Sequence, residues 1–370
     1  LGDLLKGFFE IALGAFSGAV SNLFAAMGAS EFITSLVVDG IIAGVGGILT
    51  FLPNIVILFF ALAILEDSGY MARVAYVMDG LMGAIGLSGR AFIPMLLGFG
   101  CTVPAVMASR ALEDKRDRLK TIFITPFMSC SARLPVYVLL SQMFFGKWAG
   151  LAAFSMYLLG LIVAITVALI VSKNTKKYET HTLLIELPEY KKPNAHTIFI
   201  YVWEKIKDYL TKAGTTIFLA SIVLWFLLNF GVSGLCENMA DSFAANIAKF
   251  IVPIMRPTGL GYWQIVVALI SGIAAKEVVV SSMSVLFGIS NIASAEGMAA
   301  LLGDLGAVGF TGANAYAMMV FVLLYIPCVA TIATIRRESG SAKFTLATVA
   351  TQLGTAWVMS AAVYNLIKLF

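Results

Sequence analysis

Long apolar runs separated by short charged segments dominate the chain. Several runs reach or exceed the roughly 18 apolar residues that an α-helix needs to cross a lipid bilayer. The pattern therefore predicts an all-α fold, a polytopic bundle of membrane helices, and the length of the runs excludes the short alternating strands of a membrane barrel. The predicted spans are residues 37–65, 92–109, 121–143, 148–172, 213–230, 262–289, 315–335 and 344–366.

The polar segments between the runs predict the topology. The charged loop 113–120 and the basic segment 173–212 belong on the cytoplasmic side by the positive-inside rule. Within the latter, residues 198–210 predict an amphipathic surface helix. Residues 1–36 predict an amphipathic or partly inserted N-terminal segment. No cleavable signal peptide is visible, and a start without Met indicates a piece of a longer protein.

Composition supports the membrane class. Apolar residues make up 60% of the chain and charged residues 12%, against about 45–50% and 25% in soluble domains. The net charge of +4 is concentrated in a few loops, so it indicates lipid contact and topology, and no nucleic-acid partner is expected. Three of the four cysteines lie in apolar runs, which does not predict a disulfide framework.

Two stretches of the sequence resemble one another and indicate an internal repeat. Residues 96–101 end in Cys101 and run on to Arg110, and residues 323–328 end in Cys328 and run on to Arg337. Repeated halves with interrupted apolar segments are how many transporters build a site near the membrane midplane. The predicted domains are the N-terminal segment 1–36, a first gate repeat 37–143, connecting helices 144–263 and a second gate repeat 264–370.

Glycines, prolines and charges predict where helices break. In the first repeat, Gly44 begins a glycine cluster that ends near Pro53 and argues for a break; with a one-residue slip it faces Gly272. The pair Lys276–Glu277 splits the span 262–289. An odd number of membrane crossings must also lie between the external loop that follows residues 213–230 and the cytoplasmic basic residues at 336–343, which predicts that the span 262–289 is re-entrant. The count makes the two halves parallel, whereas many transporters have inverted halves, so both orientations stay open.

Charged residues at membrane depth are candidate site residues. A charge at a helix centre costs about 2.5–3.5 kcal/mol on insertion scales, so each one needs a reason. Glu66 and Asp67 either contribute to a transport path or end a helix at the interface. Arg133 either supports the path or ties helices together through backbone carbonyls. For Glu277 we favour a functional role, because its span has no nearby end.

Sulfur-containing residues form the other candidate set. Cys101, Cys130 and Cys328 each lie close to proline, which frees backbone carbonyls and is tolerated only inside protein or along a water-lined cavity. Thiolate and thioether ligands favour soft and borderline metals, so the three thiols predict a shared metal path. The alternative is that each is a small buried apolar residue. The nearby prolines and methionine are Pro104, Pro126, Pro135, Pro327 and Met128.

Several segments resemble the signature sequences of the bacterial ferrous-iron transport protein B family. They are residues 65–73, 98–105 and 126–137, and residues 272–279 resemble the start of that family's second gate segment. The resemblance extends over nearly the whole chain. It implies a permease that imports Fe²⁺ across the bacterial cytoplasmic membrane, with Cys101, Cys130 and Cys328 along the ion path.

The chain departs from that family at its start. Family members begin with a cytoplasmic G-protein domain, and no G-x-x-x-x-G-K-[ST] loop occurs here. The resemblance therefore implies a permease portion that is not an enzyme and binds no permanent cofactor, with GTP bound only in the missing domain. Implied partners are Fe²⁺, the bilayer, that domain, small accessory proteins of the same system and a second copy. Two alternatives stay open: a carrier of nucleosides or other organic solutes, and a non-transporting membrane anchor. The sequence does not distinguish a channel-like mechanism from alternating access.

Overall fold

The computed structural model describes residues 2–27, 31–174, 190–231, 234–236, 239–289, 292 and 294–369, and these are almost entirely helical. The exception is a short antiparallel hairpin of β1 (Phe230–Gly231) and β2 (Gly234–Leu235). The polytopic all-α prediction is confirmed. The chain divides into two compact units, and each is described by itself. The first unit holds Leu1–Val74 and Leu184–Phe243, and the second holds Ala75–Leu183 and Ala244–Phe370.

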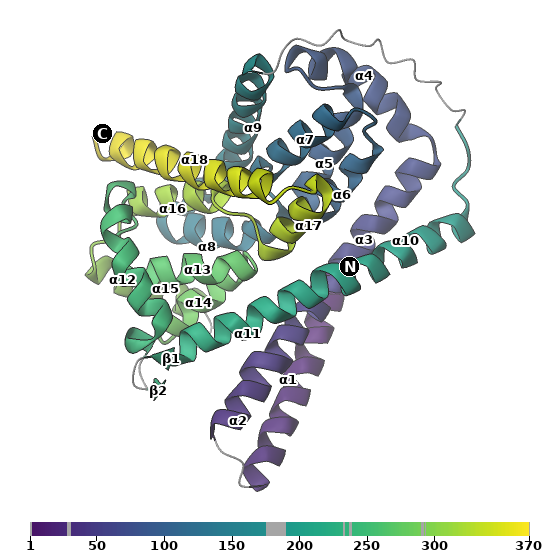
Figure 1. Ribbon diagram of the computed structural model, residues 1–370. Coiled ribbons are helices and arrows are strands. Elements are labelled where there is room, and N and C mark those ends of the chain that lie inside the picture. Colours follow the sequence, from purple (N-terminus) through teal and green to yellow (C-terminus); the bar gives the residue numbers. More distant parts are fainter. Residues whose placement is uncertain are drawn as a thin grey trace. The chain divides into compact units, whose positions relative to one another are not determined.

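The first unit is built around α3, against which α1, α10 and α11 pack (Figure 1). Helix α10 has a polar and an apolar side, and it confirms the amphipathic helix predicted at 198–210. A π-helical turn precedes both α3 and α11. The helices and turns of this unit are α1 (Gly2–Ala26), α2 (Glu31–Ser35), η1 (Leu36–Ile42), α3 (Ala43–Asp67), α10 (Ala195–Tyr209), η7 (Leu210–Gly214), α11 (Thr215–Asn229) and η8 (Met239–Asp241).

The break predicted near Gly44 is wrong. Helix α3 runs without interruption from Ala43 to Asp67 and contains Pro53. A Cβ atom on Gly44 would meet the hydroxyl of Ser221 in α11. This glycine therefore serves the close approach of two helices rather than an unwound segment.

The second unit contains two series of helices in corresponding order. The first series is α4 (Tyr70–Ala84), η2 (Gly89–Ala91), α5 (Phe92–Gly100), α6 (Thr102–Ala108), η3 (Ser109–Ala111), α7 (Lys115–Ile124), η4 (Thr125–Phe127), η5 (Ser131–Arg133), α8 (Leu134–Phe145), η6 (Gly146–Trp148) and α9 (Ala149–Asn174). The second is α12 (Phe243–Met255), η9 (Arg256–Thr258), α13 (Trp263–Ala274), α14 (Val278–Leu286), α15 (Ala295–Ala307), α16 (Gly312–Leu324), α17 (Val329–Ser339) and α18 (Ala342–Leu369).

Each series contains a helical hairpin. Helices α13 and α14 pack against each other around a break at residues 275–277, which confirms the predicted interruption at Lys276. Helices α5 and α6 do the same around Cys101. At the base of this hairpin Arg90 Nη1 lies 2.6 Å from Glu113 Oε1. The prediction of a single span at 92–109 is therefore wrong: both of its ends lie on the same side.

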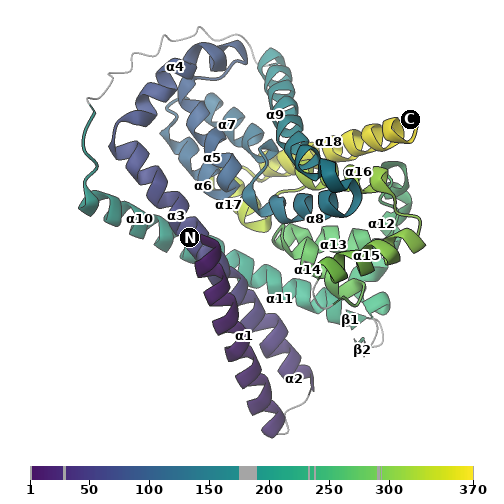
Figure 2. The ribbon, with the colours of Figure 1, turned by 180° about the vertical axis from the view of Figure 1, so that it is seen from behind.

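Each series also contains a span that is broken near its middle. Helices α7 and α8 are joined through η4 and η5, and α16 and α17 are joined through residues 325–328. Helix α8 packs on α16, and α7 packs on α17 (Figures 1 and 2). The first half of one span therefore lies beside the second half of the other. The two spans run antiparallel, so the halves of the protein are inverted rather than parallel.

The order of elements also corrects the register of the repeat. The hairpins correspond to one another, as do the broken spans. Cys130 is thus the structural counterpart of Cys328, and Cys101 corresponds to the tip at residues 275–277. The sequence offset had paired Cys101 with Cys328 instead.

The lengths of the apolar helices agree with a membrane protein. Four helical stretches in the described residues are long and apolar enough to cross a membrane, or up to six if each of two sharply bent pairs is one span. One bent pair lies in each series, α4 with α5 at 105° and α12 with α13 at 101°. The repeat therefore extends beyond the hairpins and broken spans.

Candidate functional site

The tips of both hairpins and the breaks of both spans come together in the second unit. A hydrogen bond from Ser131 to the carbonyl of Gly100 joins the first hairpin tip beside Cys101 to the first break beside Cys130. Lys276 donates to the carbonyl of Ile326, which joins the second tip to the break that contains Cys328, and α6 and α17, which follow Cys101 and Cys328, pack side by side. The structure thus brings the three thiols that sequence analysis singled out to one place, together with both charges of the second hairpin tip.

All three cysteines are extended residues before a helical segment, and for Cys130 this segment is the 3₁₀ turn η5. Cys101 and Cys328 are both extended residues immediately before a helix, α6 and α17 respectively. The first N–H groups of a helix have no partner within it, and this end of a helix favours negative charge. The Sγ atom of Cys328 lies 3.1 Å from the hydroxyl oxygen of buried Thr331.

Arg133 stabilises the break in the first span. Its side chain is only 1% exposed. Its Nη1 group donates to the carbonyl of Met128 at 2.9 Å and its Nη2 group to that of Pro126 at 3.3 Å. Of the two interpretations of Arg133, the structure supports contact with backbone carbonyls, but these belong to its own span.

Lys276 stabilises the break in the second span. The residue is 2% exposed, and its ammonium group donates a hydrogen bond to the carbonyl of Ile326. The same group lies 3.2 Å from the ring centroid of Tyr325, which is a cation–π contact. A buried cation therefore satisfies carbonyls freed at each break, as irregular backbone at membrane depth requires.

Tyr325 and Ser131 were not identified from the sequence. Ser131 Oγ donates to the carbonyl of Gly100 at 2.8 Å and so joins the first hairpin to the first break. The hydroxyl of Tyr325 is buried without a hydrogen-bond partner in the described part of the chain. A Cβ atom on Gly272 would meet this hydroxyl and a methyl group of Val279. The position of Tyr325, two residues before the Pro327–Cys328 pair, offered a signal.

The remaining candidates of this unit lie around the thiols. Glu277 is half-buried and immediately precedes α14. Met128 is buried, and its Cβ lies 3.0 Å from where a Cβ on Gly98 would stand, so α5 packs closely on the first break. Pro104 is buried within α6, and Pro327 is buried directly before Cys328.

Glu66 and Asp67 belong to the first unit, where they contact α10. An oxygen of Asp67 accepts a hydrogen bond from the backbone N–H of Asn194 at 2.7 Å. Burial raises the pKa of the Tyr201 hydroxyl, and the adjacent Glu66 carboxylate raises it further. These contacts at the end of α3 favour the helix-end interpretation of the two carboxylates.

The converging groups do not form a complete coordination sphere. Among the residues that the structure describes, no group of three or more His, Cys, Asp and Glu side chains is arranged to hold a metal ion.

Two inverted series, each with a re-entrant hairpin and a broken span, define a polytopic helical membrane protein of the gate-repeat class. The family model described as Gate, nucleoside recognition, matches residues 48–144 and 210–342, and the model for the ferrous iron transport protein B C terminus matches residues 153–205. The chain belongs to the ferrous iron transport protein B family and corresponds to its membrane portion. The predicted repeat boundaries, 37–143 and 264–370, stay a prediction.

Curated relatives carry the same family name. The chain is 44% identical over 375 residues to the Fe(2+) transporter FeoB of Staphylococcus aureus (strain COL), covering 100% of this chain and 54% of the relative. It is 42% identical over 340 residues to that of Methanocaldococcus jannaschii, covering 90% and 50%. A Porphyromonas gingivalis protein, a fusion of Fe(2+) transport protein A with the transporter, is 38% identical over 412 residues, covering 100% and 48%. The chain thus spans about half the length of these relatives. No solved structure matches it.

Proposed function

We propose that this chain is the permease portion of a protein that imports Fe²⁺ across the bacterial cytoplasmic membrane. The observation that carries the proposal is that Cys101, Cys130 and Cys328 lie at the first hairpin tip and at the breaks of both spans, which hydrogen bonds and helix packing join. The names of the relatives, Fe(2+) transporter, support the choice of ion.

The proposed path combines sulfur ligands with a carboxylate. A partly dehydrated ion contacts the three thiols, the thioether of Met128 and the carboxylate of Glu277. Sulfur donors favour Fe²⁺ over Mg²⁺ and Ca²⁺, which prefer oxygen. Binding at several weak positions allows the ion to leave again. The free hydroxyl of Tyr325 is available to a water molecule that the ion retains.

The cations of the site have a supporting role in this proposal. Arg133 and Lys276 keep the carbonyls of the two breaks satisfied, so that the irregular backbone next to the thiols persists inside the membrane. The chain needs no permanent cofactor for this process and performs no chemical reaction on the ion.

The proposal extends to partners outside the chain. We place GTP binding in a G domain of the longer protein, because no phosphate-binding loop sequence occurs here. The fused relative from Porphyromonas gingivalis supports a small accessory protein of the same system as a second partner.

A carrier of nucleosides or other organic solutes is the second candidate, favoured by the description of the matching Gate model. Both candidates are tested with the full-length protein in liposomes, supplied with ⁵⁵Fe²⁺ or with a radiolabelled nucleoside. The proposal requires accumulation of iron and not of nucleoside. Nucleoside uptake without iron uptake would establish the carrier instead, and uptake of neither would favour the membrane anchor.

A further inference from the structure

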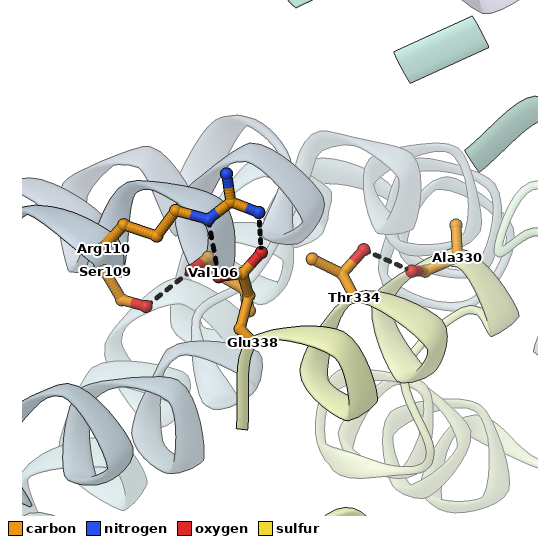
Figure 3. Close-up of polar contacts among 6 residues, drawn as sticks. All are labelled: Val106, Ser109, Arg110, Ala330, Thr334 and Glu338. Carbon is orange, nitrogen blue, oxygen red and sulfur yellow. Dashed lines mark hydrogen bonds and ion pairs between the residues drawn. The ribbon is translucent and has the colours of Figure 1, made fainter. Parts of the chain in front are cut away.

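A bidentate ion pair joins the ends of two helices that both begin at a site cysteine. Arg110 Nε lies 2.7 Å from Glu338 Oε2, and Arg110 Nη2 lies 2.5 Å from Glu338 Oε1. Arg110 follows α6, and Glu338 lies in the last turn of α17 (Figure 3). The side chain of Glu338 is only 7% exposed and that of Arg110 52%, so the carboxylate is held inside and the guanidinium covers it.

The two helices form a parallel pair that the ion pair joins at its far end. Helices α6 and α17 pack side by side, with Cys101 and Cys328 at their starting ends. Arg110 lies nine residues after Cys101, and Glu338 lies ten residues after Cys328. At 1.5 Å per helical residue, the pair stands about 14 Å from the thiols along both helices.

A buried apolar cluster packs the two helices together between their ends. Val106 of α6 and Ile335 of α17 are fully buried in one apolar cluster with Ile122. Within each helix a hydroxyl is bonded to its own backbone, Ser109 to the carbonyl of Val106 at 2.6 Å and Thr334 to that of Ala330 at 2.7 Å. Close-packed helices move as bodies rather than deforming.

We propose that Arg110 and Glu338 are a positioning pair that sets the spacing of Cys101 and Cys328. Breaking the pair lets the far ends of α6 and α17 separate, and the helices pivot about the buried cluster, which changes the spacing of the two thiols. One part of the inference rests on the proposed function, namely that the spacing of the two thiols governs the capture of iron. Arginine suits the role because its planar fork fixes the orientation of a carboxylate as well as its distance.

The test measures spacing and transport separately in the full-length protein. Spacing is measured as the rate at which a short bifunctional thiol reagent links Cys101 to Cys328, with Cys130 and Cys236 replaced by Ser. Transport is measured as ⁵⁵Fe²⁺ uptake against iron concentration with all cysteines present. The variants are Arg110→Glu, Glu338→Arg, the double exchange R110E/E338R and the milder Glu338→Gln. Arg337→Glu, an exposed arginine on the same helix, is the matched control.

The single variants should change the linking rate by about threefold or more, the scale of coupling between contacting residues. The double exchange should restore the rate, and the control should leave it unchanged. The inference would be overturned if the linking rate were unchanged in Glu338→Gln and in whichever of Arg110→Glu and Glu338→Arg folds. It would also be overturned if the double exchange folded but did not restore the rate. A changed linking rate with an unaltered KM for iron would leave the positioning pair in place and count against the thiol path instead.

Discussion

The ammonium group of Lys276 donates a hydrogen bond to the backbone carbonyl of Ile326, fifty residues further along the chain. Ile326 lies in the break between α16 and α17, and Lys276 lies at the tip of the second hairpin. A charged side chain that is costly in a membrane thus has a specific structural partner. The hairpin and the broken span are one structural assembly.

Replacing Lys276 with Met should destabilise this assembly. The partly buried carbonyl of Ile326 would lose its donor, at a cost of up to about 1–3 kcal/mol, and the contact with Tyr325 would also be lost. Thermal unfolding in detergent measures the effect. Lys343→Met, which removes an exposed lysine, is the control. Equal stability of the two variants would show that the hydrogen bond contributes nothing.

Replacing Cys101 or Cys328 with Ser should reduce iron uptake without reducing the yield of folded protein. The hydroxyl nearly preserves volume but is a hard and weakly acidic donor. We expect a loss of about tenfold or more, since changing even an outer partner of a metal site costs 10–100-fold in affinity. Preference for iron over magnesium should weaken as well. Uptake of ⁵⁵Fe²⁺ per folded molecule is the measurement, with Cys236→Ser as the control. Undiminished uptake in both site variants would rule out the thiol path.

Replacing Glu277 with Gln keeps the shape of the side chain and removes its charge. A unit charge close to a divalent cation inside a protein contributes several kcal/mol, so uptake of each divalent cation should fall. Their order of preference should stay the same, because Glu277 attracts charge and does not distinguish between donors. Competition between iron, manganese and cobalt uptake measures both properties. Glu296→Gln, on the exposed first turn of α15, should have no effect; a reordered preference would assign Glu277 to selectivity.

Replacing Gly272 with Ala should perturb the second hairpin. The new methyl group would meet Tyr325 and Val279, and overpacking of this kind costs about 1–3 kcal/mol. Gly303→Ala is the matched control, because a Cβ atom there meets nothing within 4 Å. Adding Tyr325→Phe to the Gly272 variant should recover part of the stability, since it removes the colliding hydroxyl. If both alanine variants unfold alike, the close approach at Gly272 has no energetic weight.

The sequence predicted one break that contains charge, at Lys276 and Glu277, and missed the others, including the break that contains Arg133. Lys276 and Glu277 in an apolar run require an interruption, because neither is tolerated on a lipid-facing helix. The tip at Cys101 carries no charge and is flanked by glycines, so the run 92–109 resembles an ordinary span. Near Gly44 the sequence predicted a break where the helix is continuous. Glycine permits either unwinding or close packing, and only the position of Ser221 shows which applies.

The register of the repeat was misread for a physical reason. Cys101 and Cys328 both precede a helix in an extended conformation, and the same local geometry selects similar residues around them. Cys130 has the same extended conformation before η5, so the local pattern at Cys328 had two candidates in the first repeat, and the sequence offset selected Cys101. The true counterpart of Cys328 is Cys130, as the order and packing of the helices show. The convergence of the three thiols is independent of which pairing is used.

Because the Arg90–Glu113 ion pair closes the base of the first hairpin, reporter enzymes fused just before Arg90 and just after Glu113 should detect the same compartment. A sidedness map drawn from apolar runs alone would assign these two fusions to opposite compartments. That map would assign every later segment to the wrong side of the membrane. Counting the second hairpin as a single span as well would then restore the correct side for the segments that follow it. Such a map agrees with reporters at both ends of the chain and is wrong throughout the middle.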